Sequence, residues 1–134
     1  MKILFVDDER TPTQYFVDAL RSADHEVNFV RKAADAKKEV TKAEGFDYDA
    51  VILDIMMPPG PYASASPDGL WTGFYILRDL RFRHPEIPVI ALTNAVDPAL
   101  LEALQLQPNV KTVDRTQILP SALPEIVRTT VEPR

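Results

Sequence analysis

Three short runs of apolar residues constrain the fold of this chain more than any other feature. They are Ile3–Val6, Ala50–Leu53 and Val89–Leu92. Each run is apolar at consecutive positions rather than at alternating ones, which is typical of a strand buried on both faces. Such strands belong to a parallel sheet that lies between two layers of helices, so we expect an α/β fold.

The segments between these runs have the patterns of helices and outer strands. Glu26–Val30 alternates polar and apolar residues like an outer strand, and Val110–Val113 is a weaker candidate. Helices are expected over Ala33–Val40 and over Leu70–Phe82. Three more are expected after N-cap residues: one after Thr11-Pro12, one over Ala99–Leu104 after Asp97-Pro98, and one after Ser121 that extends to Val131. Five strands that alternate with five helices predict a doubly wound parallel sheet with the strand order 2-1-3-4-5.

Composition excludes several classes of protein. The chain has 134 residues, which fits one domain, and it has no cysteine for a disulfide or a thiolate metal site. Its net charge is -5 and no apolar run reaches membrane-helix length, so neither nucleic acid nor a membrane is an expected partner. A cytoplasmic location is therefore expected. Two basic groups are interpreted as solvated helix faces: Arg31, Lys32, Lys37 and Lys38, and Arg78, Arg81 and Arg83.

Aspartates follow two of the buried runs at the point where each run ends. Asp7 and Asp8 come directly after the first run, and Asp54 comes directly after the second. In a sheet of this order, ligands bind beyond the carboxyl ends of the first and third strands. Three carboxylates there repel one another unless a hard cation such as Mg²⁺ lies between them. Each aspartate taken alone is also explained as a cap or loop residue.

The motifs around these aspartates resemble the response-regulator receiver domains of two-component signalling. The similar segments are Val6–Glu9 (VDDE), Leu53–Pro58 (LDIMMP) and Ala91–Asn94 (ALTN), and the resemblance spans nearly the whole chain. It implies a single receiver domain over residues 1–134, with the flavodoxin-like fold of CheY-like proteins.

The resemblance also implies a role for each matching residue. Asp54 would be the phosphoacceptor, a carboxylate nucleophile that forms an acyl phosphate. Asp7, Asp8, Asp54 and the backbone carbonyl of Met56 would hold Mg²⁺, and Thr93 would contact the phosphoryl group. The donor would be a histidine kinase or a histidine phosphotransfer protein. The downstream protein target is not indicated by the sequence.

One expected feature of the family is missing. Receivers usually carry a Lys-Pro pair after the fifth strand, and the spacing from Thr93 places Arg115 where that lysine would be. Arginine is a cation that reaches phosphate, but its planar guanidinium differs from the point charge of lysine. Asp114 is a competitor for the guanidinium. Lys111 is the alternative cation, although it falls early in its strand, and both assignments remain open at this point.

A proline- and glycine-rich insertion occupies residues 58–69, close after Asp54. Its prolines and glycines exclude a regular helix and predict a stiff loop. We hypothesise that the loop gates access to Asp54 or docks a partner through Tyr62 and Trp71. A tolerated surface insertion explains it equally well.

Three functions compete at this stage. The leading one is a phosphoacceptor receiver whose output is a protein contact, since the chain ends after the last expected helix. The second is a receiver-like binding module that is not phosphorylated. The third is a magnesium-dependent phosphatase, which usually has a second aspartate two residues after the nucleophile. That position is Met56, so an enzyme is not expected.

Overall fold

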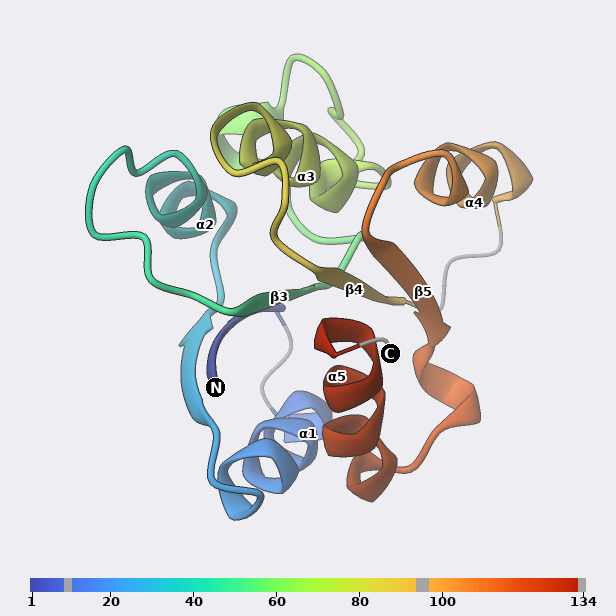
Figure 1. Ribbon diagram of the computed structural model, residues 1–134. Coiled ribbons are helices and arrows are strands. Elements are labelled where there is room, and N and C mark those ends of the chain that lie inside the picture. The colour runs from blue at the N-terminus through green and yellow to red at the C-terminus, as the bar shows by residue number, and fades with distance from the viewer. Residues whose placement is uncertain (9–10, 94–96, 133–134) are drawn as a thin grey trace.

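The computed structural model describes residues 1–8, 11–93 and 97–132 and has the predicted α/β architecture (Figure 1). The strands are β1 (Lys2–Val6), β2 (Glu26–Val30), β3 (Ala50–Leu53), β4 (Val89–Thr93) and β5 (Val110–Asp114). The α-helices are α1 (Thr11–Ser22), α2 (Ala33–Val40), α3 (Thr72–Arg83), α4 (Pro98–Gln105) and α5 (Leu123–Val131), with short 3-10 turns η1 (Gly60–Tyr62), η2 (Arg115–Gln117) and η3 (Pro120–Ala122). The motif residues Glu9 and Asn94, and the predicted side-chain cap of Thr11, lie outside what the structure describes.

The sheet has the predicted strand order, β2-β1-β3-β4-β5, and all neighbouring strands are parallel. Val6, the last residue of β1, lies opposite Val30 of β2 on one side and Leu53 of β3 on the other. The chain therefore leaves β1 and β3 at the same edge of the sheet. This register brings the residues that follow the two strands together.

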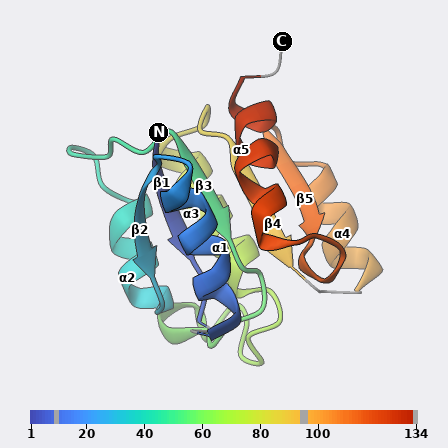
Figure 2. The same ribbon diagram turned by 90° about the horizontal axis from the view of Figure 1, so that it is seen from below.

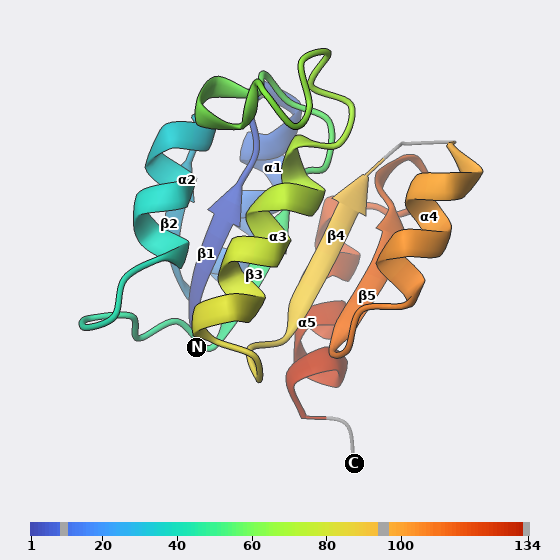
Figure 3. The ribbon, with the colours of Figure 1, turned by 90° about the horizontal axis from the view of Figure 1, so that it is seen from above.

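Two layers of helices cover the sheet. Helices α2, α3 and α4 pack on one face, and α1 and α5 pack on the other (Figure 1). Figure 2 shows the face covered by α1 and α5, and Figure 3 shows the opposite face. Side chains of β1 alternate between the layers, since Leu4 belongs to the α2–α4 core whereas Ile3 and Phe5 belong to the α1–α5 core. Burial on both faces is the physical reason for the consecutive apolar residues. In the ranges described, no helix is long and apolar enough to cross a membrane.

Two helix starts differ from the sequence expectation. Helix α3 begins at Thr72 instead of Leu70, because Gly69 turns the chain with a positive φ of 76° and Leu70 is still part of the loop. Helix α5 is not capped by Ser121, so that prediction is wrong. Its N-cap is Ala122, which makes no side-chain cap bond, because η3 leads straight into the helix. The predicted Asp97 cap is confirmed by a bond that it accepts from the amide of the second residue of α4.

Arg81 does not lie on a solvated face, which corrects the interpretation of the second basic group. Its guanidinium is half-buried and donates hydrogen bonds to the carbonyls of Ile87 at 2.6 Å, Pro108 at 2.8 Å and Asn109 at 3.1 Å. These bonds tie the end of α3 to the segments that enter β4 and β5. Arg81 is therefore a cross-link of the fold and not a candidate for ligand binding.

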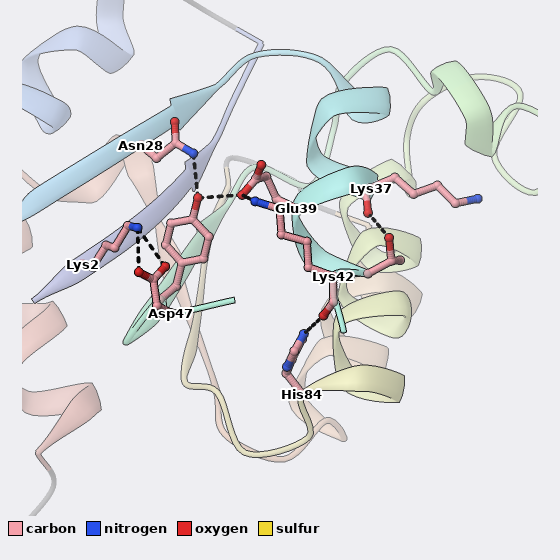
Figure 4. Close-up of polar contacts among 9 residues, drawn as sticks. Lys2, Asn28, Lys37, Glu39, Lys42, Asp47 and His84 are labelled. Atoms are coloured by element: carbon pink, nitrogen blue, oxygen red, sulfur yellow. Dashed lines mark hydrogen bonds and ion pairs between the residues drawn. The ribbon is translucent and has the colours of Figure 1, made fainter. Parts of the chain in front are cut away.

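A polar network joins α2 to the edge of the sheet (Figure 4). The Asn28 amide donates to the Tyr48 hydroxyl at 2.6 Å, and that hydroxyl donates to the Glu39 carboxylate at 2.7 Å. Lys42 forms an ion pair with the same carboxylate at 3.1 Å, and the His84 ring contacts the carbonyl of Lys42 at 2.9 Å. These contacts fix the position of α2 relative to β2.

The insertion at residues 58–69 is an ordered loop rather than a free one. Tyr62 is 7% exposed, and its hydroxyl donates to Asp79 of α3 at 2.6 Å. The amide of Ser66 donates to the carbonyl of Tyr62 at 2.8 Å, and the amide of Met57 donates to Gly69 at 3.1 Å. The loop is therefore closed at its base and anchored in its middle. The hypothesis that Tyr62 contacts a partner is wrong because the ring is buried; Trp71 is half-buried.

The Tyr62→Phe variant is expected to lower the free energy of unfolding by about 1–2 kcal/mol, because the Asp79 carboxylate loses a hydrogen-bond donor. Urea denaturation measures the change. The matched variant Tyr15→Phe removes a hydroxyl from a ring that is 63% exposed and is expected to change the free energy by less than about 0.5 kcal/mol. Equal effects of the two variants would show that the Tyr62 hydroxyl does not anchor the insertion.

Candidate functional site

Backbone hydrogen bonds fix two aspartates at the carboxyl edge of the sheet. The amide of Asp54 donates to the carbonyl of Val6 at 2.8 Å, and the amide of Asp7 donates to the carbonyl of Val30 at 3.1 Å. Both bonds continue the strand pairing one residue beyond the strands. Oxygen atoms of Asp7, Asp8 and Asp54 all lie within 4.8 Å of one another. The structure therefore brings together the three carboxylates that the sequence placed at the strand ends.

Burial makes this carboxylate cluster electrostatically costly without a cation. Asp7 is fully buried, Asp54 is 5% exposed and Asp8 is half-buried. Burial raises the pKa of Asp54 to about 8, the Asp7 charge adds to the rise, and the Arg115 charge opposes it. A hydrogen bond with Asp8 also favours the protonated form of Asp54. The donors are all oxygen atoms, which suits a hard divalent ion such as Mg²⁺ better than a softer metal.

Arg115 is the basic residue that the structure places beside the carboxylates. Its Nη1 lies 2.9 Å from Asp7 Oδ2 and 4.0 Å from Asp54 Oδ1. The alternative, Lys111, is exposed and is the second residue of β5, three residues before the strand ends. Asp114 does not take the guanidinium, since its carboxylate accepts the Thr116 amide at 2.9 Å and caps η2. The spacing argument therefore identified the basic residue that lies at the site.

Two residues of α1 hold the Arg115 side chain, and the sequence did not reveal them. Nη2 donates to the Thr13 hydroxyl at 3.1 Å, and the guanidinium lies 5.9 Å from the centre of the Phe16 ring. The guanidinium thus bridges α1, the end of β1 and the start of η2. A lysine ammonium at this position would lack the second nitrogen that reaches Thr13 while the first pairs with Asp7.

Thr93 and Met56 lie on segments next to the cluster. Thr93 is the last residue of β4, is 2% exposed and pairs in register with Asp114, the residue before Arg115. Met56 is half-buried in the bend after β3. The following residue, Met57, is held by a hydrogen bond that its carbonyl accepts from the Thr72 hydroxyl at 2.8 Å. Thr93 thus ends β4 at the carboxyl edge of the sheet, and Met56 lies two residues after Asp54.

Gly73 brings the start of α3 against the backbone of Asp54. Its amide donates to the carbonyl of Ile55 at 2.8 Å. A Cβ atom at Gly73 would lie 2.3 Å from the Asp54 carbonyl oxygen and 2.6 Å from Ile55 Cα, so no side chain fits. An isolated glycine inside a helical pattern was the signal that could have indicated this close approach.

The Gly73→Ala variant is expected to lower the free energy of unfolding by about 2–3 kcal/mol, because either α3 or the Asp54 backbone must move. Gly45→Ala is the control. Gly45 has a φ of 79° with nothing within 4 Å of its added Cβ, so only backbone strain applies there. That strain is expected to cost about 1 kcal/mol. Thermal or urea denaturation of both variants tests the difference, and a smaller loss at position 73 than at position 45 would contradict the close packing.

Comparison with known proteins identifies the family. The model of the family described as "Response regulator receiver domain" matches residues 3–118. The chain belongs to this family. It is thus a receiver domain of two-component systems. Receiver domains are phosphoacceptor signalling domains, and the acidic cluster lies at the strand edge where the sequence motifs predicted it.

Curated relatives of this receiver are larger proteins. Over 93 residues it is 36% identical to the transcriptional regulatory protein TcrA of Mycobacterium tuberculosis, covering 69% of this chain and 31% of that protein. Over 97 residues it is 32% identical to the hybrid signal transduction histidine kinase L of Dictyostelium discoideum, covering 69% of this chain and 5% of that protein. The receiver therefore spans less than a third of either relative.

Solved structures confirm the fold of the receiver. A CheY-like receiver domain protein from Methanospirillum hungatei superimposes with a TM-score of 0.77 at 16% identity, covering 98% of this chain and 94% of that one. Chemotaxis protein CheY4 of Vibrio cholerae superimposes with a TM-score of 0.73 at 21% identity, covering 96% of this chain and 97% of that one. At these identities the similarity shows the fold alone.

Proposed function

We propose that this receiver accepts a phosphoryl group on Asp54 and signals through contact with another protein. The observation that carries the proposal is the convergence of Asp7, Asp8 and Asp54 within 4.8 Å at the carboxyl edge of the sheet, with Arg115 beside them. The donor is a histidine kinase or a histidine phosphotransfer protein, the donor class of the family. The downstream target is a protein, because a net charge of -5 gives no support to binding of a nucleic-acid backbone.

Mg²⁺ is the proposed cofactor. The carboxylates of Asp7, Asp8 and Asp54 and the backbone carbonyl of Met56 would hold it. A bound Mg²⁺ supplies positive charge that neutralises the phosphoryl oxygens during transfer. The buried, oxygen-only donor set and the raised pKa of Asp54 support a divalent cation, since a cation compensates the repulsion among the carboxylates.

The proposed reaction is a direct phosphoryl transfer. One carboxylate oxygen of Asp54 forms a bond to phosphorus, the bond between phosphorus and the donor imidazole nitrogen breaks, and the bonding electron pair stays on that nitrogen. The product is an acyl phosphate on Asp54. Asp54 must be ionised to attack, so loss of its proton precedes the transfer. The hydrogen bond from its amide to Val6 holds the backbone in place during the reaction.

Thr93 and Arg115 are the residues proposed to respond to the phosphoryl group. The Thr93 hydroxyl is a hydrogen-bond donor at the end of β4, and Arg115 is a cation whose Nη1 lies 4.0 Å from Asp54 Oδ1. In the phosphorylated state, Arg115 is proposed to exchange part of its contact with Asp7 for a contact with the phosphoryl oxygens. That exchange would alter the bridge between the start of η2 and Thr13 of α1.

Acetyl phosphate and Mg²⁺ provide the test. Intact-mass measurement is expected to show an increase of one phosphoryl group in the native chain and none in Asp54→Asn. Omission of Mg²⁺ is expected to suppress the increase. If the native chain gains no phosphoryl group from acetyl phosphate or from a phosphorylated histidine phosphotransfer protein, the proposal fails. A receiver-like binding module that is not phosphorylated would then be the better account.

A further inference from the structure

A hollow of about 350 Å³ lies between the start of α2 and the insertion. Its walls are mainly apolar and consist of Ala33, Ala34, Met57, Pro58 and Gly60. Figure 3 shows the insertion lying against the amino-terminal end of α2, at the carboxyl edge of the sheet. A space of this size accommodates one large apolar side chain.

The insertion shapes this hollow and holds it open. Gly60 turns with a φ of 49°, and a Cβ atom there would lie 3.5 Å from Ala33 Cβ, so the loop touches the first residue of α2. Two residues further on, Tyr62 is bonded to Asp79 and lies under the Lys37 ammonium, 5.2 Å from its nitrogen. One wall of the hollow is therefore built by residues 58–69 and anchored to α3. The hollow exists before any partner binds, which limits the ordering cost of binding.

Positive charge surrounds the hollow. Arg31 and Lys32 are exposed and complete its lining. With Lys38 they also line an adjoining hollow of about 420 Å³ on the β2 side of α2. In the part of the chain that the structure describes, none of these three residues forms an ion pair. The N-cap of α2 is Lys32, which makes no side-chain cap bond, and Asp35 is the acidic residue in the first turn of the helix.

Nearby acidic groups do not cancel this charge. Glu39 lines the adjoining hollow, but its carboxylate is already bound by Tyr48 and Lys42 (Figure 4). Asp35 is the other acidic residue there, and three cationic residues, Arg31, Lys32 and Lys38, line the same hollow. The corner between β2 and α2 is thus basic on a chain whose net charge is -5. Local charge of the opposite sign favours an acidic occupant.

We propose that this corner docks an acidic segment of a partner protein, with one apolar side chain inserted into the 350 Å³ hollow. Arg31, Lys32 and Lys38 would pair with carboxylates on either side of that anchor. A single buried anchor with a charged surround is a common form of protein recognition. This docking site lies at the carboxyl edge of the sheet, because Met57 in its lining is three residues after Asp54. It does not require phosphorylation of Asp54, so failure of that reaction leaves this proposal standing.

Selection from a phage library of random short peptides tests this docking site directly. The native chain serves as bait, and the Arg31→Glu/Lys32→Glu double variant removes peptides that bind elsewhere. Selected peptides are expected to carry one large apolar residue flanked by Asp or Glu. A synthetic representative is expected to bind the double variant, and a variant with the hollow filled by Ala34→Met, about tenfold more weakly than the native chain.

Matched variants control for general effects of charge and size. Arg78→Glu/Arg83→Glu reverses two exposed charges on α3, and Ala99→Met enlarges an exposed alanine on α4. Both are expected to bind the peptide within about twofold of the native chain. Four results would overturn the proposal: no enriched peptides, enriched peptides without acidic residues, equal binding to all variants, or self-association of the chain that Ala34→Met abolishes. Specific capture of a DNA oligomer or an anionic phosphatidylserine vesicle instead of the peptide would also overturn it.

Discussion

Asp54→Asn is expected to raise the free energy of unfolding of the magnesium-free chain by about 3 kcal/mol at mildly alkaline pH. Asp54 is 5% exposed, and burial together with the Asp7 charge raises its pKa to about 8. Asparagine has nearly the same shape but no charge, so it removes the repulsion without leaving a cavity. The expected gain is smaller than the full pKa shift implies, because the site relaxes and Arg115 already offsets part of the charge.

The same pKa shift fixes the sign of the pH dependence. In the unfolded chain Asp54 releases its proton near pH 4, whereas in the native chain it keeps the proton up to about pH 8. The native state therefore binds more protons within this window, and the stability of the native chain falls as pH rises through it. Asp54→Asn is expected to flatten this slope, measured by urea denaturation at several pH values with a chelator present.

Two controls sharpen the experiment. Asp18→Asn changes an exposed aspartate of α1 and is expected to alter the free energy by less than about 0.5 kcal/mol. Saturating Mg²⁺ is expected to stabilise the native chain and to stabilise Asp54→Asn less, because a ligand that binds only the folded state adds stability by mass action. A stability curve of the magnesium-free native chain that rises with pH over this window would contradict the electrostatic description of the site.

Arg115→Ala is expected to have the opposite effect, a loss of about 3 kcal/mol without Mg²⁺ at neutral pH, because it removes a cationic partner of a buried charge. The Asp7 carboxylate is fully buried, and its ion pair with Arg115 at 2.9 Å compensates part of its charge. The variant also leaves Thr13 without its bond to the guanidinium. Arg115→Lys retains the positive charge but not the second nitrogen that binds Thr13. Its free energy of unfolding is therefore expected to fall by less than that of Arg115→Ala.

Arg128→Ala is the matched control for this prediction. Arg128 forms an ion pair with Glu125 on the exposed surface of α5, and removal of an exposed pair is expected to cost less than about 1 kcal/mol. Added Mg²⁺ is expected to recover part of the loss in Arg115→Ala, since the metal and the guanidinium compensate the same carboxylates. Equal losses in the two alanine variants would show that Arg115 does not stabilise the buried cluster.

The elements that form the sheet and the acidic site were predictable because local patterns determine them. Residues such as Leu4 and Phe5 face opposite layers, so both are apolar, and that requirement is visible in the sequence. The position of Asp54 follows from the end of its strand, and a constant spacing from Thr93 identified Arg115. The strands and the position of Asp54 followed from residues close together in the chain and from the geometry of a parallel sheet, whereas the position of Arg115 followed from the resemblance to receiver domains.

Other features depend on contacts between distant segments, which no local pattern records. Thr13 binds Arg115 across 102 positions, and Tyr62 reaches Asp79 of another element. The prediction that Tyr62 faces a partner failed because an aromatic residue in a loop gives no sign of whether α2 and α3 will bury it. Arg81 was misassigned for a related reason, since the carbonyls that it binds become available only after three elements have assembled.

The most direct test of the proposed function is to locate the phosphorylated residue chemically. Borohydride reduces an aspartyl phosphate to homoserine, so the chain is treated with acetyl phosphate and Mg²⁺, reduced, digested and sequenced by tandem mass spectrometry. Homoserine is expected at position 54 in the complete reaction and at no position when the donor or Mg²⁺ is omitted. Homoserine at another aspartate, or phosphorylation without any conversion at Asp54, would contradict the assignment of Asp54 as the phosphoacceptor.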